Sequence, residues 1–215
     1  MSRPRRRTGP GALLCGLLAL GSSSGLDAQT THRLPLVPEN VHWGYYDASV
    51  EPAVTIRSGD RVAFENLLAR GLDRLRLAGV AEERFTDAMR AVDAIQEKGP
   101  GAHPLNGPIR MEGAEPGDVL EVRILDIGYL ADYGVSGHLP GGGTLPDDFP
   151  SAALRRFELD TLAGTARMVG VDGVVIRLRP FLGSIGMAPP LLRGRISSRA
   201  PDYHAGNLDN RELVA

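Results

Sequence analysis

Six side chains in this sequence of 215 residues combine chemically useful groups with loops rich in glycine and proline. They are His42, Asp47, His103, His204, Asn207 and Asp209. Histidine and aspartate can move protons or bind a divalent metal ion, and asparagine can orient a polar substrate. No two of the histidines have the His-x-x-x-His spacing of a helical metal site. The residues alone therefore leave two interpretations open: a reactive site, and hydrogen-bonded histidines that only stabilise loops.

The most constrained of these loops is residues 99–118, which contains His103. It holds five glycines and four prolines in twenty residues. Glycine permits positive φ angles, and proline fixes φ and removes a hydrogen-bond donor. We expect a stiff, shaped loop that presents His103 and then leads into a strand.

A second candidate region is the aromatic segment His42-Trp43-Gly44-Tyr45-Tyr46-Asp47. One interpretation is that the aromatic rings close the edge of a hydrophobic core. The other is that His42 and Asp47 face a pocket that the rings wall off. The sequence does not distinguish the two.

The N-terminus has the pattern of a secretory signal peptide over residues 1–28. Four arginines precede an apolar run at residues 11–21, and small residues lead to Ala28. We therefore expect export to the periplasm or the extracellular space, and Arg6-Arg7 leaves a twin-arginine route open. A membrane-anchored N-terminus is the alternative.

Removal of this segment changes the chemistry that residues 29–215 can support. The only cysteine, Cys15, leaves with it, so neither a disulfide nor a thiol nucleophile is expected. Acidic residues then outnumber basic ones, and no basic patch favours nucleic acid. We expect no membrane contact after cleavage.

Hydrophobic patterning indicates a mainly β chain with one helix. Residues 54–57, 61–65 and 120–124 alternate apolar and polar side chains, as strands do. Asp172-Gly173 lies between two apolar runs and predicts a hairpin. Apolar residues at helical spacing predict an amphipathic helix over about residues 81–98. These elements fit an all-β sandwich or a β-rich α+β domain.

Four segments, in order, resemble the acetamidase/formamidase family, which hydrolyses short linear amides. They are residues 42–60 (HWGYYDASVEPAVTIRSGD), 99–127 (GPGAHPLNGPIRMEGAEPGDVLEVRILDI), 182–189 (LGSIGMAP) and 194–213, which contains HAGNLDNREL. Two positions depart from the family pattern: Asn106 stands for the usual threonine and Ala205 for the usual glycine. Family members look longer, and we expect a C-terminal strand-rich part with a Gly-Asp-x-His element to be missing.

The resemblance implies a β-sandwich of jelly-roll character that spans residues 29–215 and binds a small amide substrate. It also implies a divalent metal, most simply zinc, that activates water and leads to release of ammonia. By position, His103 and Asp209 would be metal ligands. His42, Asp47 and Asn207 would line the catalytic pocket, and His204 would support a ligand.

Two further expectations concern the whole molecule. If part of the family fold is missing, the chain is instead a non-catalytic secreted β-sandwich that binds a ligand, or an inactive fragment. Strand edges left without a partner would also favour a homo-oligomer.

Overall fold

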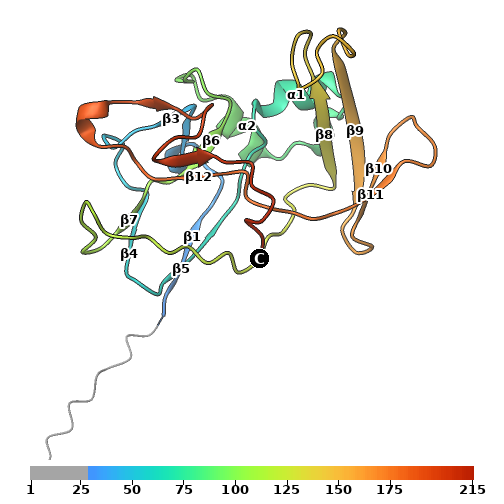
Figure 1. Ribbon diagram of the computed structural model, residues 1–215. Coiled ribbons are helices and arrows are strands. Elements are labelled where there is room, and N and C mark those ends of the chain that lie inside the picture. The colour runs from blue at the N-terminus through green and yellow to red at the C-terminus, as the bar shows by residue number, and fades with distance from the viewer. Residues whose placement is uncertain (1–28) are drawn as a thin grey trace, which may run out of the picture.

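The computed structural model describes residues 29–215, and Figure 1 shows how their elements are arranged. The predicted signal peptide, residues 1–28, lies outside the described residues. Strands far outnumber helices in the described part, so the prediction of a mainly β chain is confirmed. Within residues 29–215, no helix combines the length and apolar character that a membrane crossing requires.

The described residues form two α-helices and fourteen strands. The helices are α1 (Gly71–Leu77) and α2 (Asp87–Asp93). The strands are β1 (Thr31–Leu34), β2 (Val41–Trp43), β3 (Tyr45–Tyr46), β4 (Val54–Ile56), β5 (Arg61–Phe64), β6 (Pro104–Asn106), β7 (Ile109–Met111), β8 (Tyr133–His138), β9 (Ala153–Asp160), β10 (Thr165–Met168), β11 (Val175–Arg177), β12 (Ser184–Gly186), β13 (Ile196–Ser197) and β14 (Ala205–Asn207).

The largest sheet has the antiparallel order β11-β10-β9-β8 and stands on the right in Figure 1. Its longest pairing joins β8 to β9, from Tyr133 opposite Glu158 to His138 opposite Ala153. The hairpin predicted at Asp172-Gly173 is present and joins β10 to β11, with Ala166 opposite Ile176. The first strand of this hairpin lies a few residues earlier than the sequence pattern predicts.

The remaining strands form five two-stranded pairs. Strands β1 and β5 run parallel, as do β4 and β7. The antiparallel pairs are β2 with β6, β3 with β13, and β12 with β14. These short pairs join segments that are distant in sequence, and three of them surround the loop that carries His103.

The helix predicted over residues 81–98 is wrong in its extent. Residues Glu82–Arg84 form a 3-10 turn, and Phe85 is extended, with φ −91° and ψ 128°. Thr86 then starts α2, since its side chain accepts a hydrogen bond from the Met89 amide at 3.2 Å. Helix α2 ends at Asp93, and the first helix, α1, was not predicted at all.

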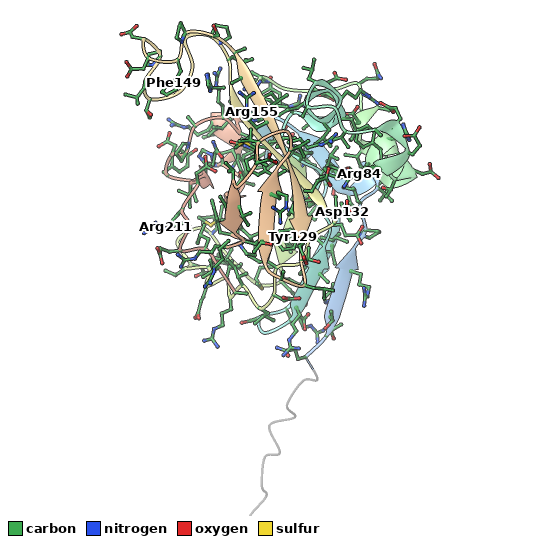
Figure 2. All side chains as sticks on the ribbon, turned by 90° about the vertical axis from the view of Figure 1, so that its right-hand side faces the viewer. Arg84, Tyr129, Asp132, Phe149, Arg155 and Arg211 are labelled. Carbon is green, nitrogen blue, oxygen red and sulfur yellow. The ribbon has the colours of Figure 1, made fainter. Side chains whose placement is uncertain are left out.

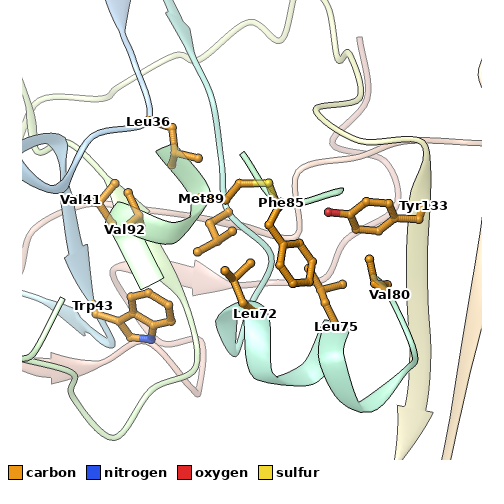
Figure 3. Packing of buried hydrophobic residues seen from close by; sticks show 11 residues of the cluster. Leu36, Val41, Trp43, Leu72, Leu75, Val80, Phe85, Met89, Val92 and Tyr133 are labelled. Atoms are coloured by element: carbon orange, nitrogen blue, oxygen red, sulfur yellow. The ribbon is translucent and has the colours of Figure 1, made fainter. Parts of the chain in front are cut away.

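The predicted apolar stripe of this region does pack against the core. Phe85, Met89 and Val92 are buried, and Figure 3 shows Val92 beside Val41 of β2 and Phe85 beside Leu75 of α1. The cluster joins side chains from several elements: Leu36, Val41, Trp43, Leu67, Leu72, Leu75, Val80, Phe85, Met89, Val92 and Tyr133. The two helices therefore supply a large share of this core cluster.

Arg84 links this helical layer to the four-stranded sheet. Its guanidinium donates to both carboxylate oxygens of Glu158, at 2.9 and 2.8 Å, and to Asp132 at 2.6 Å. Figure 2 shows Arg84 and Asp132 facing each other. The same guanidinium lies 4.7 Å from the centre of the Tyr133 ring. Arg84 thus joins the helical layer to the sheet through hydrogen bonds and through its contact with an aromatic ring.

The predicted strand at residues 120–124 does not form a ladder. Residues 119–131 run as an extended ribbon between β7 and β8 (Figure 1), and no backbone hydrogen bond to them occurs within the described residues. The prediction is wrong because alternation alone does not make a sheet: a strand also needs a partner. The sequence-predicted strands at 54–57 and 61–65 do find partners, as β4 and β5.

Candidate functional site

A cavity of about 910 Å³ opens beside the loop of residues 99–103. It brings together three of the six side chains that the sequence singled out: His103, Asn207 and Asp209. The rest of its wall includes Trp43 and four basic side chains, Arg70, Arg74, Lys98 and Arg199. Residues about one hundred positions apart in the chain therefore meet at one opening.

Close backbone packing holds the His103 loop in place. The Gly44 amide donates to the His103 carbonyl at 2.9 Å, and the Ser198 amide donates to the Gly44 carbonyl at 2.9 Å. There is no room for a side chain at the contact: a Cβ on Gly101 would lie 2.5 Å from the Gly44 oxygen and 2.1 Å from Ser198 Oγ. Gly44 itself has φ +81°, which glycine adopts without strain. The glycines of this loop thus serve close approach rather than flexibility.

The ring of His103 is oriented by Ser198, and burial lowers its pKa and so favours its neutral form. Its Nδ1 lies 3.0 Å from Ser198 Oγ, which leaves Nε2 for a ligand. Partial burial lowers the pKa of His103 below 6.5, and the positive charge of Arg70 lowers it further. The carboxylate of Asp209 and the Ser198 backbone act in the opposite direction. His103 is therefore a neutral proton acceptor whose charged form a nearby carboxylate stabilises.

Strand β14 and the turn that follows it carry Asn207 and Asp209 into the cavity. Asn207 is opposite Ser184 of β12, and its Nδ2 donates to the Arg199 carbonyl at 3.0 Å. The Asp209 amide donates to the Gly183 carbonyl at 2.9 Å, and Asp209 has φ +46°. A left-handed backbone costs free energy at a non-glycine residue, and such residues cluster at functional sites.

Arg70 lines the cavity, and no sequence pattern selects it. It also has a left-handed backbone, with φ +70°, and its amide donates to the Ala102 carbonyl at 2.7 Å. In the described part of the chain, non-glycine residues with positive φ are Arg70, Ala205 and Asp209. Two of these line the cavity, and Ala205 is close to it in sequence. An arginine in a loop carries no motif, so only the fold could reveal it.

Asp47 and His42 do not line this cavity. Asp47 is buried and accepts hydrogen bonds from the Ser49 amide at 2.8 Å and the Ser49 hydroxyl at 2.7 Å. Arg195 Nε also donates to Asp47, at 2.7 Å. The two bonds from Ser49, followed by Arg195, hold the pKa of Asp47 below 3.8. Asp47 is thus an ion-paired structural residue in this arrangement.

The other two histidines are buried near the site without joining it. His42 lies in β2 between Val41 and Trp43, and burial lowers its pKa. Its Nδ1 is buried and has no hydrogen-bond partner among residues 29–215. His204 is 1% exposed, and neither of its ring nitrogens has a hydrogen-bond partner in that part of the chain. Its ring lies 4.9 Å from that of Tyr46 and 5.7 Å from that of Tyr203. Both are packed rings in this structure.

The residues of the cavity do not by themselves fit a zinc ion. Structural and catalytic zinc sites use three or four protein ligands. Across residues 29–215, no group of three or more histidine, cysteine, aspartate or glutamate side chains converges to hold a metal. The cavity offers His103 and Asp209 as donors, and a third would have to come from elsewhere.

The sequence also matches a known family over most of its length. Residues 40–201 match the sequence model of the Acetamidase/Formamidase family. The chain belongs to the acetamidase/formamidase family. This family membership confirms the resemblance seen in the four sequence segments, two of which supply His103 and Asp209.

Named relatives of this family member agree with that assignment. A stretch of 86 residues is 41% identical to a formamidase of Methylophilus methylotrophus and covers 38% of this chain and 20% of the relative. A stretch of 62 residues is 47% identical to an acetamidase of Mycolicibacterium smegmatis and covers 23% of this chain and 15% of the relative.

Solved structures show the same fold at larger size. The crystal structure of an acetamidase from Bacillus halodurans superposes with a TM-score of 0.63 at 29% sequence identity. The match covers 85% of this chain and 54% of that protein. A predicted acetamidase/formamidase from Thermoanaerobacter tengcongensis matches with a TM-score of 0.64, at 22% identity. The chain thus spans about half the length of these solved relatives.

Proposed function

We propose that this family member hydrolyses short linear amides, of the formamide and acetamide type, in the cavity beside His103. One observation carries the proposal. The fold brings His103, Asn207 and Asp209 to the same cavity from two of the segments that resemble the family. The relatives named formamidase and acetamidase supply the substrate class.

The proposed chemistry follows from the charge states of these side chains. Neutral His103 takes a proton from a water molecule as the water oxygen attacks the amide carbon. The Asp209 carboxylate favours the imidazolium ion that forms, because its negative charge raises the pKa of His103. The imidazolium ion then protonates the amide nitrogen, and the carbon–nitrogen bond breaks. One water is consumed, and one ammonia and one carboxylic acid are released.

A divalent metal, most simply zinc, stays part of the proposal without a step assigned to it. When bound, such an ion lowers the pKa of water and polarises a carbonyl group. His103 and Asp209 would hold the ion together with a third ligand from elsewhere, and His103 would then be a metal ligand in place of its proton-transfer role. Metal analysis of the purified chain tests the idea: about one zinc per chain, lost in His103→Ala, supports it, and metal-free protein that is fully active overturns it.

The architecture and location of the molecule belong to the same proposal. We infer a β-sandwich of jelly-roll character, which the short antiparallel pairs around the cavity support. We also infer export, with residues 1–28 as the signal peptide. A cell-fractionation experiment with the full chain tests export: the expected product is shortened and lies outside the cytoplasm, and a full-length cytoplasmic product contradicts it.

The competing function is a secreted module that binds a ligand without chemistry. A coupled assay of ammonia release from formamide and acetamide separates the two, provided that the carboxylic acid is measured in the same reaction. Hydrolysis predicts equal amounts of both products and many turnovers per chain. Binding of acetamide without release of either product favours the binding module.

A further inference from the structure

The cavity carries more positive charge than hydrolysis of a neutral amide requires. Arg70, Arg74 and Arg199 all line it, and their guanidinium groups make no hydrogen bond or ion pair with other residues of the described chain. Lys98 is already occupied, because it donates to the Asp93 carbonyl at 2.7 Å and lies 4.3 Å from the Trp43 ring. Asp73, another lining residue, pairs with Arg76 at 3.0 Å.

The charge balance at the opening is therefore uneven. Three guanidinium groups and one carboxylate, that of Asp209, line the cavity without an ion-pair partner in the described chain. A concave surface concentrates the field of like charges and raises the local concentration of counter-ions. Formamide and acetamide carry no charge and do not use this field.

Arg70 is the best placed of the three to act on a bound substrate. Its left-handed backbone and its amide bond to Ala102 fix it next to the His103 loop. Arg70 and His103 line the same cavity. A guanidinium group matches a carboxylate with two parallel hydrogen bonds, which orients the ligand as well as binding it.

We propose that the preferred substrates are amides that also carry a carboxylate group, such as the monoamide of a short dicarboxylic acid. The carboxylate binds at Arg70, with Arg74 and Arg199 contributing to its attraction, and the amide end lies at His103. This inference rests on the proposed amide hydrolysis and specifies its substrate class. Inorganic phosphate shares the anionic chemistry and is the competing ligand.

The test compares two amides of equal length that differ in one end. Succinic acid monoamide ends in a carboxylate, and butyramide ends in a methyl group. We expect kcat/KM to be at least about tenfold higher for the monoamide, and the ratio to fall with added salt. In Arg70→Gln and in Arg74→Gln the ratio falls towards one, whereas Arg167→Gln, an exposed arginine of β10, keeps it. Equal kcat/KM values in the wild type overturn the inference.

Failure of this inference can be told apart from failure of the amidase proposal. Succinate itself is the probe for a calorimetric titration, which needs no hydrolysis. Saturable binding of succinate that weakens in Arg70→Gln and is stronger than binding of phosphate supports the carboxylate site even if neither amide is cleaved. Cleavage of both amides at the same rate, without succinate binding, leaves the amidase proposal standing and removes this one. Circular dichroism confirms that each variant folds.

Discussion

Burial, the Asp209 carboxylate and the Arg70 guanidinium group all change the pKa of His103. Burial and Arg70 lower its pKa, and Asp209 raises it. We predict that the NMR titration of His103 has its midpoint below 6.5, that Asp209→Asn lowers the midpoint further, and that Arg70→Gln raises it. Asp172→Asn, in the turn between β10 and β11, is the control. If the titration midpoint of His103 is the same in wild type, Asp209→Asn and Arg70→Gln, the three side chains do not share a site.

The same charge balance sets the pH dependence of the proposed reaction. Because neutral His103 takes the proton from water, activity is expected to rise as pH increases through the folded pKa and to level off above it. Asp209→Asn moves this rise to lower pH, since the pKa of His103 falls. A pH–rate profile of kcat/KM measures the shift, and a profile that decreases over the same range contradicts this role of His103.

Asp47 lies outside the lining of the cavity and accepts hydrogen bonds from Ser49 and Arg195. Removal of its carboxylate leaves Arg195 and the Ser49 hydrogen bonds without their acceptor, so we predict that Asp47→Ala lowers the free energy of unfolding by about 1–3 kcal/mol at pH 7. The pKa of Asp47 is lower in the folded state, so the unfolded state binds more protons at acidic pH. The stabilisation is therefore present above pH 3.8 and is lost as pH falls through the folded pKa.

Urea unfolding of wild type and variant across acidic and neutral pH measures this effect. Asp148→Ala, in the exposed loop between β8 and β9, is the matched control and is expected to change little. If the difference in free energy of unfolding between wild type and Asp47→Ala increases as the pH falls, another group causes the destabilisation.

Local capping sets where α2 begins, and the apolar periodicity could not predict this boundary. The apolar spacing correctly identified the packing face of α2, but it suggested a helix more than twice as long. Thr86 caps α2 after an extended Phe85, so we predict that Thr86→Ala lowers stability by about 1 kcal/mol. Thermal unfolding compares it with Thr144→Ala, which lies in an exposed loop. Equal melting temperatures for the two variants would rule out a capping role.

Pairing between distant elements was the other limit of prediction from sequence. The Asp172-Gly173 turn acts over a few residues, and it correctly predicted a hairpin. The alternation at residues 120–124 is as regular, yet no described strand pairs with it. Strand β6 pairs with β2 across more than sixty residues, and no local pattern specifies that partner. Short-range turns could therefore be read from the sequence, and long-range pairs could not.

At the scale of the whole molecule, the same limit applies to the candidate site. Residue types and family segments selected His103, Asn207 and Asp209, and the fold places all three at one cavity. The same reasoning also selected His42, Asp47 and His204, which the fold packs or pairs elsewhere. It did not select Arg70, because no local sequence pattern marks this residue. Arg70 reaches the site only through its contact with Ala102, which forms in the folded chain.

The role of His103 in amide hydrolysis is tested by comparing one variant of this residue with a variant of a second histidine outside the cavity. Ammonia release from acetamide is measured for wild type, His103→Ala and His138→Ala under identical conditions. His138 is on β8, and its ring bonds the Ser151 carbonyl at 3.0 Å. We predict that His103→Ala loses at least about a hundredfold in kcat/KM, the effect expected for a proton-transferring residue, and that His138→Ala retains wild-type activity. Undiminished ammonia release by His103→Ala would show that His103 does not transfer the proton in amide hydrolysis.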